Sequence, residues 1–201
     1  MSAYLEEEEK EKPVVSVLCK EGRDKEGVII RHVYPLIFTE ENLVKLWDKI
    51  SQFPIIFGKQ LKSIKDFNRY FFTMRDKNPW PTGLFWVIDD FIGVFYLTEI
   101  FTHEADAHFT FFDKRLEGRE ELTRQMIIHL LKEFPTLNRI NVSIPCYAND
   151  KVFKFVSRVG FTSEGRKRKN TWWKEKWFDS VQFGILRSEI LPEESKDGSF
   201  N

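Results

Sequence analysis

Residues 113–120, DKRLEGRE, combine the residue types of an anion-binding turn. They follow an apolar stretch expected to form a strand, residues 107–112, and precede a periodic stretch expected to form a helix from Arg119. The first turn of a helix leaves backbone N–H groups unpaired, and the helix dipole favours an anion there. Gly118 would let a ligand approach the backbone, while Arg115 and Arg119 could donate charge-assisted hydrogen bonds to a pyrophosphate. An ordinary strand–helix loop with surface arginines would have the same composition.

Residues 149–161, NDKVFKFVSRVGF, are the second informative segment. Their apolar residues recur at helical spacing and predict a short helix with one apolar face. Gly160 is the residue type expected just past a helix end, where the backbone turns left-handed, and Phe161 then opens a strand. The apolar residues of the helix are Val152, Phe153, Val156 and Val159. Many helix–strand junctions share these features, so the segment gains meaning only beside the turn upstream.

The composition indicates a globular protein with a core rich in aromatic residues. The 201 residues include 20 Phe and 6 Trp. A net charge of zero, from 31 basic and 31 acidic residues, gives no global argument for nucleic acid or an anionic membrane as a partner. We expect neither a membrane span, which needs roughly 20 apolar residues, nor a signal peptide. Cys19 and Cys146 fit no metal or redox spacing and are interpreted as reduced thiols in a cytoplasmic protein.

The order of the predicted elements indicates a mixed α/β domain built on one sheet. We expect an acidic extension at residues 1–26, the domain at residues 27–190 and a tail at residues 191–201. Thr39 fits the N-cap of the first helix, because acidic residues follow it in the first turn. Further helices are expected at residues 63–75, 119–134 and 149–160, and strands at residues 14–18, 27–34, 83–88, 91–100, 107–112, 137–144, from 161, and at 181–187.

Taken together, the two segments resemble the GNAT superfamily of acyl-CoA-dependent N-acyltransferases, in particular its ribosomal-protein N-terminal acetyltransferase branch. In that family a turn of pattern R/Q-x-x-G-x-G/A holds the pyrophosphate of coenzyme A. Arg115, Gly118 and Glu120 stand at its three positions. A later helix opens with Asn, here Asn149, and ends in Gly-Phe, here at residues 160–161.

The resemblance covers residues 27–190, and the segment 107–120 is also similar to that of phage-encoded members. It implies a single, mostly antiparallel, twisted central sheet flanked by helices, a mixed α/β fold of the α+β type. It also implies acetyl-CoA as co-substrate and no metal. The residues that it places in the coenzyme site are Thr110, Phe111, Phe112, Arg115, Gly118, Arg119, Glu120, Asn149 and Phe155.

Two positions depart from the family pattern. Glu120 replaces a small residue, and its carboxylate would repel a pyrophosphate unless it points away or pairs with Arg115 or Arg124. Val156 stands where many members have a Tyr that can protonate the leaving thiolate, and Tyr147 is the nearest phenol in sequence. These departures motivate an alternative, in which the chain is a catalytically inactive GNAT-fold binding or assembly protein.

Acetyl transfer to an amine requires removal of a proton from the amine, so a base should border the acceptor cleft. Glu99 and His108 are the leading candidates because both are expected on central strands, where each would also fit as an ordinary strand residue. The resemblance implies an amine acceptor at a protein N-terminus, on a peptide or on a small molecule, and we expect a monomer or homodimer. A third alternative is a nucleic-acid-binding module that uses the basic run 166–169 and the adjacent Trp172-Trp173, against which the zero net charge argues.

Overall fold

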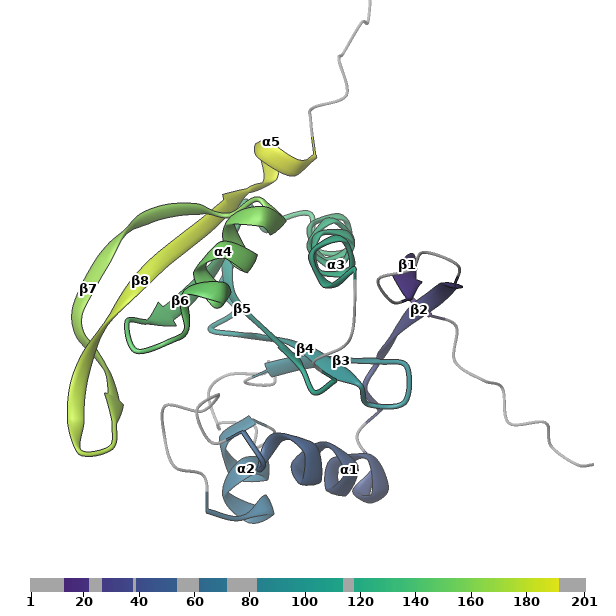
Figure 1. The fold of residues 1–201 in the computed structure, drawn as a ribbon, viewed down its shortest axis with the longest axis horizontal. Coiled ribbons are helices and arrows are strands. Elements are labelled where there is room, and N and C mark those ends of the chain that lie inside the picture. Colours follow the sequence, from purple (N-terminus) through teal and green to yellow (C-terminus); the bar gives the residue numbers. More distant parts are fainter. Residues whose placement is uncertain are drawn as a thin grey trace, which may run out of the picture.

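The computed structural model describes residues 13–21, 27–37, 39–53, 62–71, 83–113 and 118–191. This part of the chain forms one eight-stranded sheet with helices on both faces (Figure 1). The strands are β1 (Val15–Glu21), β2 (Gly27–Pro35), β3 (Gly83–Ile88), β4 (Gly93–Thr98), β5 (Glu104–Phe111), β6 (Arg139–Pro145), β7 (Thr162–Trp173) and β8 (Lys176–Leu186). The helices are α1 (Glu40–Ile50), α2 (Ile64–Phe71), α3 (Arg119–Glu133), α4 (Asp150–Val159) and α5 (Arg187–Ile190).

The sheet has the strand order β1-β2-β3-β4-β5-β6-β8-β7. Neighbouring strands are antiparallel except for β5 and β6, which are parallel. A parallel pair needs a crossover connection, and α3 provides it. The expectation of a mixed α/β fold with a single, mostly antiparallel central sheet flanked by helices is confirmed.

Side-chain caps stand at the starts of two helices, and the sequence predicts the first of them, Thr39. Thr39 Oγ1 accepts a hydrogen bond from the N–H of Asn42 at 3.2 Å, at the start of α1. Asn149 Oδ1 accepts one from the N–H of Lys151 at 2.9 Å, at the start of α4. Helix α4 ends at Gly160, whose φ of 118° lies in the region that favours glycine. Both predicted helix starts and the predicted end of α4 are therefore confirmed.

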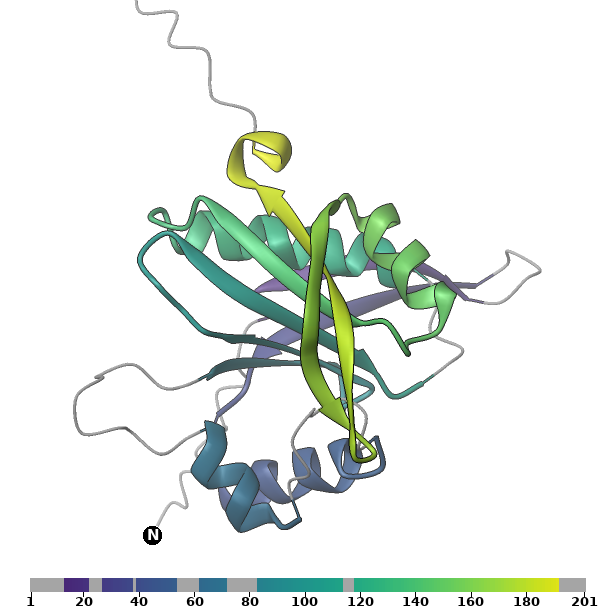
Figure 2. The ribbon, with the colours of Figure 1, turned by 90° about the vertical axis from the view of Figure 1, so that its left-hand side faces the viewer.

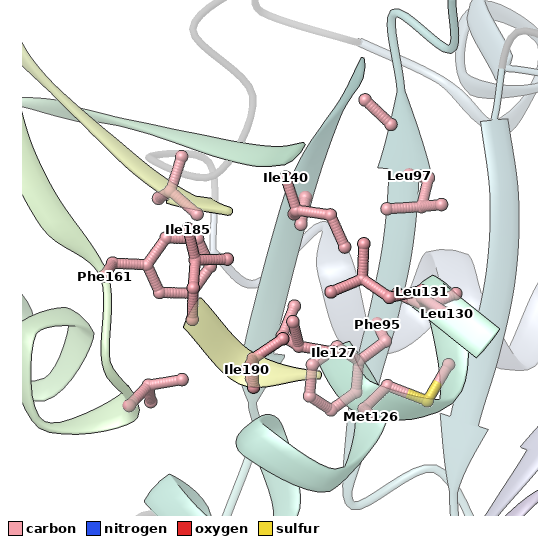
Figure 3. Close-up of a cluster of buried hydrophobic side chains, with 14 of the residues drawn as sticks. Phe95, Leu97, Met126, Ile127, Leu130, Leu131, Ile140, Phe161, Ile185 and Ile190 are labelled. Atoms are coloured by element: carbon pink, nitrogen blue, oxygen red, sulfur yellow. The ribbon is translucent and has the colours of Figure 1, made fainter. Parts of the chain in front are cut away.

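Two apolar layers enclose the sheet, one beneath α3 and α4 and the other beneath α1 and α2 (Figure 1). Alternate residues of β4 pack into the two layers. Phe95 and Leu97 belong to the first layer, and Val94 and Tyr96 belong to the second. Figure 3 shows the centre of the first layer, which includes Phe95, Leu97, Met126, Ile127, Leu130, Leu131, Ile140, Phe161, Ile185 and Ile190.

Strands β5 and β6 separate soon after they begin. Only residues 104–106 of β5 pair with residues 139–141 of β6. Beyond these residues β5 continues along β4 to Phe111, whereas β6 continues along β8 to Pro145. The sheet therefore opens between its two parallel strands.

The hairpin of β7 and β8 is longer than the sequence indicates. Strand β8 begins at Lys176 rather than at residue 181, and β7 continues to Trp173. Residues 162–170 are all exposed, so they lack the apolar alternation by which a strand is recognised in a sequence. Pairing with β8 holds β7 in the sheet, and the hairpin curves away from the other strands (Figures 1 and 2).

Three smaller differences concern the first half of the chain. Phe91, expected in a strand, lies in the turn between β3 and β4 with a φ of 55°, and its apolar character reflects burial rather than strand structure. Strand β1 buries Val15 and Val17, so the sheet includes part of the expected N-terminal extension. Of the helix expected at residues 63–75, residues 72–75 lie outside the described residues.

Within the described ranges, no helix has the length and apolar character needed to cross a membrane.

Candidate active site

A cavity of about 350 Å³ lies where β5 and β6 separate, beside the first turns of α4. Its walls come from β4, β5, β6, α4 and the connection between β6 and α4. The lining residues are Tyr96, Ala107, His108, Phe109, Thr110, Val142, Ser143, Ile144, Pro145, Tyr147, Ala148, Asn149, Val152 and Val156. Three residues expected in a site, His108, Thr110 and Asn149, are thus brought together.

The backbone of β5 directs N–H groups across this opening. The N–H of Phe112 donates to the carbonyl of Ile92 at 2.9 Å, so it points toward the turn that precedes β4. Because hydrogen bonding alternates along an antiparallel strand, the amide of Thr110 also points toward β4, and those of Phe109 and Phe111 point toward β6. Of residues 110–112, which the sequence places in the coenzyme site, only Phe111 therefore has its amide directed toward β6, and Phe109 is directed in the same way.

His108 has its imidazole held from two sides. Its Nε2 and Thr98 Oγ1 form a hydrogen bond of 2.8 Å. Its ring stacks on Tyr96 with 4.4 Å between centroids and 8° between planes, and Tyr96 stacks in turn on Phe85 at 4.9 Å and 8°. Burial lowers the pKa of His108 to about 4, so the imidazole is neutral at pH 7. A neutral imidazole can accept a proton as positive charge develops on a nearby amine.

Tyr147 also lines the cavity, and its buried hydroxyl has no hydrogen-bond partner among the described residues. Its ring meets Phe178 edge-on at 4.8 Å and lies nearly parallel to Trp173 at 6.0 Å, both on the β7–β8 hairpin. Burial raises the pKa of Tyr147, which keeps the phenol protonated at neutral pH. A buried hydroxyl without a hydrogen-bond partner lowers the stability of the folded state, and a hydrogen bond from it to a bound group would remove this cost.

Helix α4 contributes aliphatic and capping side chains. Val156 is fully buried and lines the cavity, so an aliphatic group stands at the position where the sequence resemblance leads one to expect a Tyr. Asn149 caps the helix through Oδ1, so the predicted coenzyme contact involves a residue that also fixes the helix start. Phe155 lies outside the lining, and its ring packs against Phe109 at 5.4 Å and Phe111 at 5.9 Å.

The start of α3 is the place where the sequence predicts an anion-binding turn, of which residues 114–117 lie outside the described residues. Gly118 has a φ of 71°, a conformation that favours glycine, directly before the helix. Gly118 stands at the N-cap position and has no side chain with which to cap α3, so a ligand could pair with the N–H groups of the first turn. The guanidinium of Arg119 lies over the ring of Phe111 at 5.9 Å. Arg115 lies outside the described residues.

Glu120 forms an ion pair with Arg158 of α4, with 3.6 Å between Oε1 and Nη1. The sequence suggested Arg115, which lies outside the described residues, or Arg124 as the partner. Arg124 donates to the carbonyl of Val159 at 3.1 Å, so its guanidinium is directed to the end of α4. The packing of α3 against α4 accounts for the difference, because it brings charged side chains of the two helices together.

Glu99 lies outside the cavity lining, at the exposed end of β4 with a φ of 48°. The acidic residues near it on β5 also lie outside the lining. Glu104 accepts a hydrogen bond from Asn141 at 3.1 Å. Burial raises the pKa of Asp106, and a hydrogen bond from Asn141 opposes this rise. Of the two candidate bases, His108 is the one that the fold places at the cavity.

The basic run of residues 166–169 lies on the exposed edge strand β7. Arg166 pairs with Asp179 of β8 at 2.8 Å. None of these basic residues lines the cavity. Among the described residues, no three His, Cys, Asp or Glu side chains gather closely enough to hold a metal ion.

Several solved acetyltransferase structures share this fold. A variant of spermidine N-acetyltransferase SpeG from Vibrio cholerae has a TM-score of 0.63 and 16% identity, and the match covers 81% of this chain and 96% of that one. For an acetyltransferase of the GNAT family from Bacillus anthracis the TM-score is 0.58, the identity 16%, and the coverage 86% of this chain and 100% of that one. A structure described as a probable acetyltransferase has a TM-score of 0.57 and 19% identity, with 79% of this chain and 94% of that chain covered.

Sequence comparison does not extend these structural matches. No protein-family model matches the sequence, and no curated protein matches it either. The likeness therefore concerns the course of the backbone, which is shared over most of each chain. The chain has the fold of the GNAT acyl-CoA N-acyltransferases.

Proposed function

We propose that this protein is an acetyl-CoA-dependent N-acetyltransferase that acts on a primary amine of a protein N-terminus, a peptide or a small molecule. The observation that best supports the proposal is the cavity between β5 and β6, which brings strand amides, His108 and Tyr147 to one place. Solved structures with the same fold are named acetyltransferases. Spermidine, named for one of them, makes polyamines one acceptor class to test.

The described residues suit the parts of acetyl-CoA. The first turn of α3, which follows Gly118 at the N-cap position, suits the negatively charged pyrophosphate. The apolar walls of the cavity, including Val142 and Ile144, suit the pantetheine arm. The ion pair with Arg158 offsets the charge of Glu120, one of the two acidic residues, Glu120 and Glu121, in this first turn.

The proposed reaction forms a bond from the amine nitrogen to the acetyl carbon and breaks the bond from that carbon to sulfur. The amine loses one proton, and the departing thiolate gains one. The N–H of Phe109 or Phe111 would donate to the carbonyl oxygen as negative charge develops on it. His108 would accept the proton of the amine, and the hydroxyl of Tyr147 would supply the proton to sulfur.

Thermal unfolding of the full chain with and without acetyl-CoA tests the coenzyme site. Binding at 100 times the dissociation constant should add about 2.7 kcal/mol to the stability of the folded state. Ala148→Phe should fill the cavity and remove the shift in Tm, whereas Ser157→Phe on the exposed surface of α4 is the control. No shift for the unmodified protein at millimolar coenzyme would refute the proposal.

Release of free thiol in the presence of amines tests transfer itself. We expect release that depends on both acetyl-CoA and an amine. Coenzyme binding without any release over a panel of peptides, small amines and spermidine would instead indicate a binding or assembly protein with this fold.

A further inference from the structure

The β7–β8 hairpin concentrates positive charge that the composition of the whole chain conceals. Residues 166–176 contain six of the 31 basic residues and one of the 31 acidic residues. The net charge of zero is therefore a sum over an uneven distribution, and the field at this hairpin is positive. The six basic residues are all exposed and are Arg166, Lys167, Arg168, Lys169, Lys174 and Lys176.

The charged part of β7 is tied to β8 by one carboxylate. Asp179 accepts a hydrogen bond from the backbone N–H of Lys169 at 2.8 Å and pairs with Arg166 at 2.8 Å. The register of the two strands is irregular between Lys167 and Thr171, and Lys169 has a φ of 50°. Asp179 thus holds this irregular segment at two points, so its basic side chains start from a defined backbone.

Two indole rings lie on the same face of the hairpin as Arg166. Trp172 and Trp177 are cross-strand partners, with 5.2 Å between ring centroids and 62° between planes, and they are 46% and 57% exposed. Val181, the partner of Arg166, shares a face with Trp177 because side chains alternate along β8. Cross-strand partners also share a face. The six basic residues together with Trp172 and Trp177 are called the hairpin surface below.

A second copy of this chain is a poor occupant for the hairpin surface. Strand β7 is the last strand in the described sheet, so pairing of its edge with another strand is the simplest alternative. Antiparallel pairing of two β7 strands along their full length would place residues 166–169 of one opposite the same residues of the other. Like charges opposite each other destabilise a sheet. Exposed charges and a bulge are also features that protect an edge strand from such pairing.

Protection of the edge explains the charges but not the tryptophans. Two adjacent exposed indoles add apolar surface at the strand that such protection would keep polar. Aromatic rings beside cations are the combination that binds single-stranded nucleic acid, because bases stack on the rings and phosphates pair with the cations. An acidic peptide would match the cations alone.

We propose that the hairpin surface binds single-stranded nucleic acid, with phosphates on its basic side chains and bases on Trp172 and Trp177. The hairpin lies in front of the rest of the sheet in Figure 2. The cavity between β5 and β6 is lined by other residues. The inference is therefore independent of the proposed acetyl transfer.

Fluorescence anisotropy of the full chain with a labelled oligothymidylate of about 12 nucleotides tests the proposal. We expect binding at 50 mM salt that weakens about twentyfold to fiftyfold at 200 mM, as for counterion release at three or four phosphates. At 200 mM salt, duplex DNA of the same length should bind at least threefold more weakly, because its bases are stacked inside the helix. Absence of binding at 50 mM salt, or equal binding of the duplex at 200 mM, would overturn the proposal.

A pair of double variants tests whether the hairpin supplies the cations. Lys174→Ala combined with Lys176→Ala should lower the affinity at least tenfold at 50 mM salt and make its salt dependence shallower. Lys65→Ala combined with Lys132→Ala removes two exposed cations from α2 and α3 and is the matched control. Equal losses in the two double variants would mean that the nucleic acid is attracted to the whole molecule, which would overturn the proposal.

Substitution at Trp172 tests stacking of bases. Trp172→Ala should lower the affinity at least fivefold at both salt concentrations, and Trp172→Phe should restore most of the loss. Phe101→Ala removes a ring that is 60% exposed elsewhere on the surface, and this control should leave the affinity unchanged. An unchanged affinity in Trp172→Ala would overturn the proposed contact with bases.

Polyglutamate distinguishes an acidic protein partner from nucleic acid. Added as a competitor at the same concentration of negative charge, it should displace the labelled strand at least tenfold less effectively than unlabelled oligothymidylate. Equal displacement by the two competitors would assign the hairpin surface to an acidic protein and overturn the proposal.

Discussion

His108 and Tyr147 are two side chains of one cavity on which the same environment acts in opposite directions. Burial disfavours charge, so it lowers the pKa of His108 to about 4 and raises the pKa of Tyr147. Both groups are neutral at pH 7. The imidazole is then free to take a proton and the phenol to give one, which is the division of roles that an acid–base pair needs.

Tyr147→Phe should lower kcat about a hundredfold or more, because general acid–base catalysis typically contributes 10²–10⁴-fold. The ring contacts with Trp173 and Phe178 are retained, and the variant removes an unpaired buried hydroxyl, so stability should not fall. Steady-state thiol release measures kcat, and the thermal shift with acetyl-CoA checks that the coenzyme still binds. An unchanged kcat would assign the protonation of sulfur to water.

His108 should make the protein less stable in mild acid. Its pKa is 6.5 for an unperturbed histidine and about 4 in the folded state, so the unfolded chain binds more protons between these values. Stability therefore falls as the pH drops from about 6.5 to about 4. The loss is at most on the order of 3 kcal/mol, and the partial exposure of His108 to solvent reduces it.

His108→Phe is the variant that measures this contribution, because it retains a ring on Tyr96 and does not titrate. Urea unfolding at pH 7.5 and pH 5 should show a larger loss of unfolding free energy in the unmodified protein than in the variant. Equal losses in the two proteins would mean that His108 does not cause the acid sensitivity.

The β7–β8 hairpin lies outside the central strands and contacts Tyr147, a residue of the cavity. Trp173 and Phe178 lie against Tyr147. Trp172 and Trp177 pair with each other at 5.2 Å and are both exposed. Because side chains alternate along a strand, adjacent Trp172 and Trp173 point to opposite faces of the hairpin. One face therefore positions a cavity residue, and the other meets solvent.

Trp173→Ala and Trp172→Ala form a matched pair at this hairpin. Trp173→Ala removes the ring beside Tyr147 and should lower kcat at least tenfold, with little change in the coenzyme-induced thermal shift. Trp172→Ala removes an exposed ring of the same size and should leave kcat within twofold. Steady-state thiol release with one peptide acceptor compares them. Equal effects of the two substitutions would show that the hairpin does not position the phenol.

The elements that could be predicted from the sequence are those whose pattern is local. Helix α4, with its cap at Asn149 and its end at Gly160, has such a pattern, and so do most of the sheet strands. The length of β7 could not be predicted, because most of its residues are exposed and β8 is the strand that pairs with it. The surroundings of Tyr147 and the partner of Glu120 depend on packing between distant segments, which no local pattern encodes.

At the scale of the whole molecule, the opening between β5 and β6 does not divide the core. The layer beneath α3 and α4 includes Phe95 of β4 on one side of the opening and Ile185 of β8 on the other (Figure 3). Met126 and Ile127 of α3 belong to the same layer. The helices thus bridge the separated strands, which keeps the cavity open at one end of a continuous core.

Strand β1 is the outermost strand at the other edge of the sheet, and its side chains extend this core. Val15 and Val17 are 8% and 7% exposed and belong to the layer beneath α3. Full burial of a valine contributes about 1.5–3 kcal/mol, so a chain that begins at residue 27 should lose about 3–6 kcal/mol of unfolding free energy. This is a large part of the roughly 5–15 kcal/mol that holds a domain folded.

A chain of residues 13–201 keeps β1 and serves as the control for the shorter chain of residues 27–201. Urea unfolding should give the control the same midpoint as the full chain and the shorter chain a clearly lower one. A midpoint for residues 27–201 equal to that of the full chain would place the domain boundary at residue 27, as expected from the sequence, and would show that the core does not depend on β1.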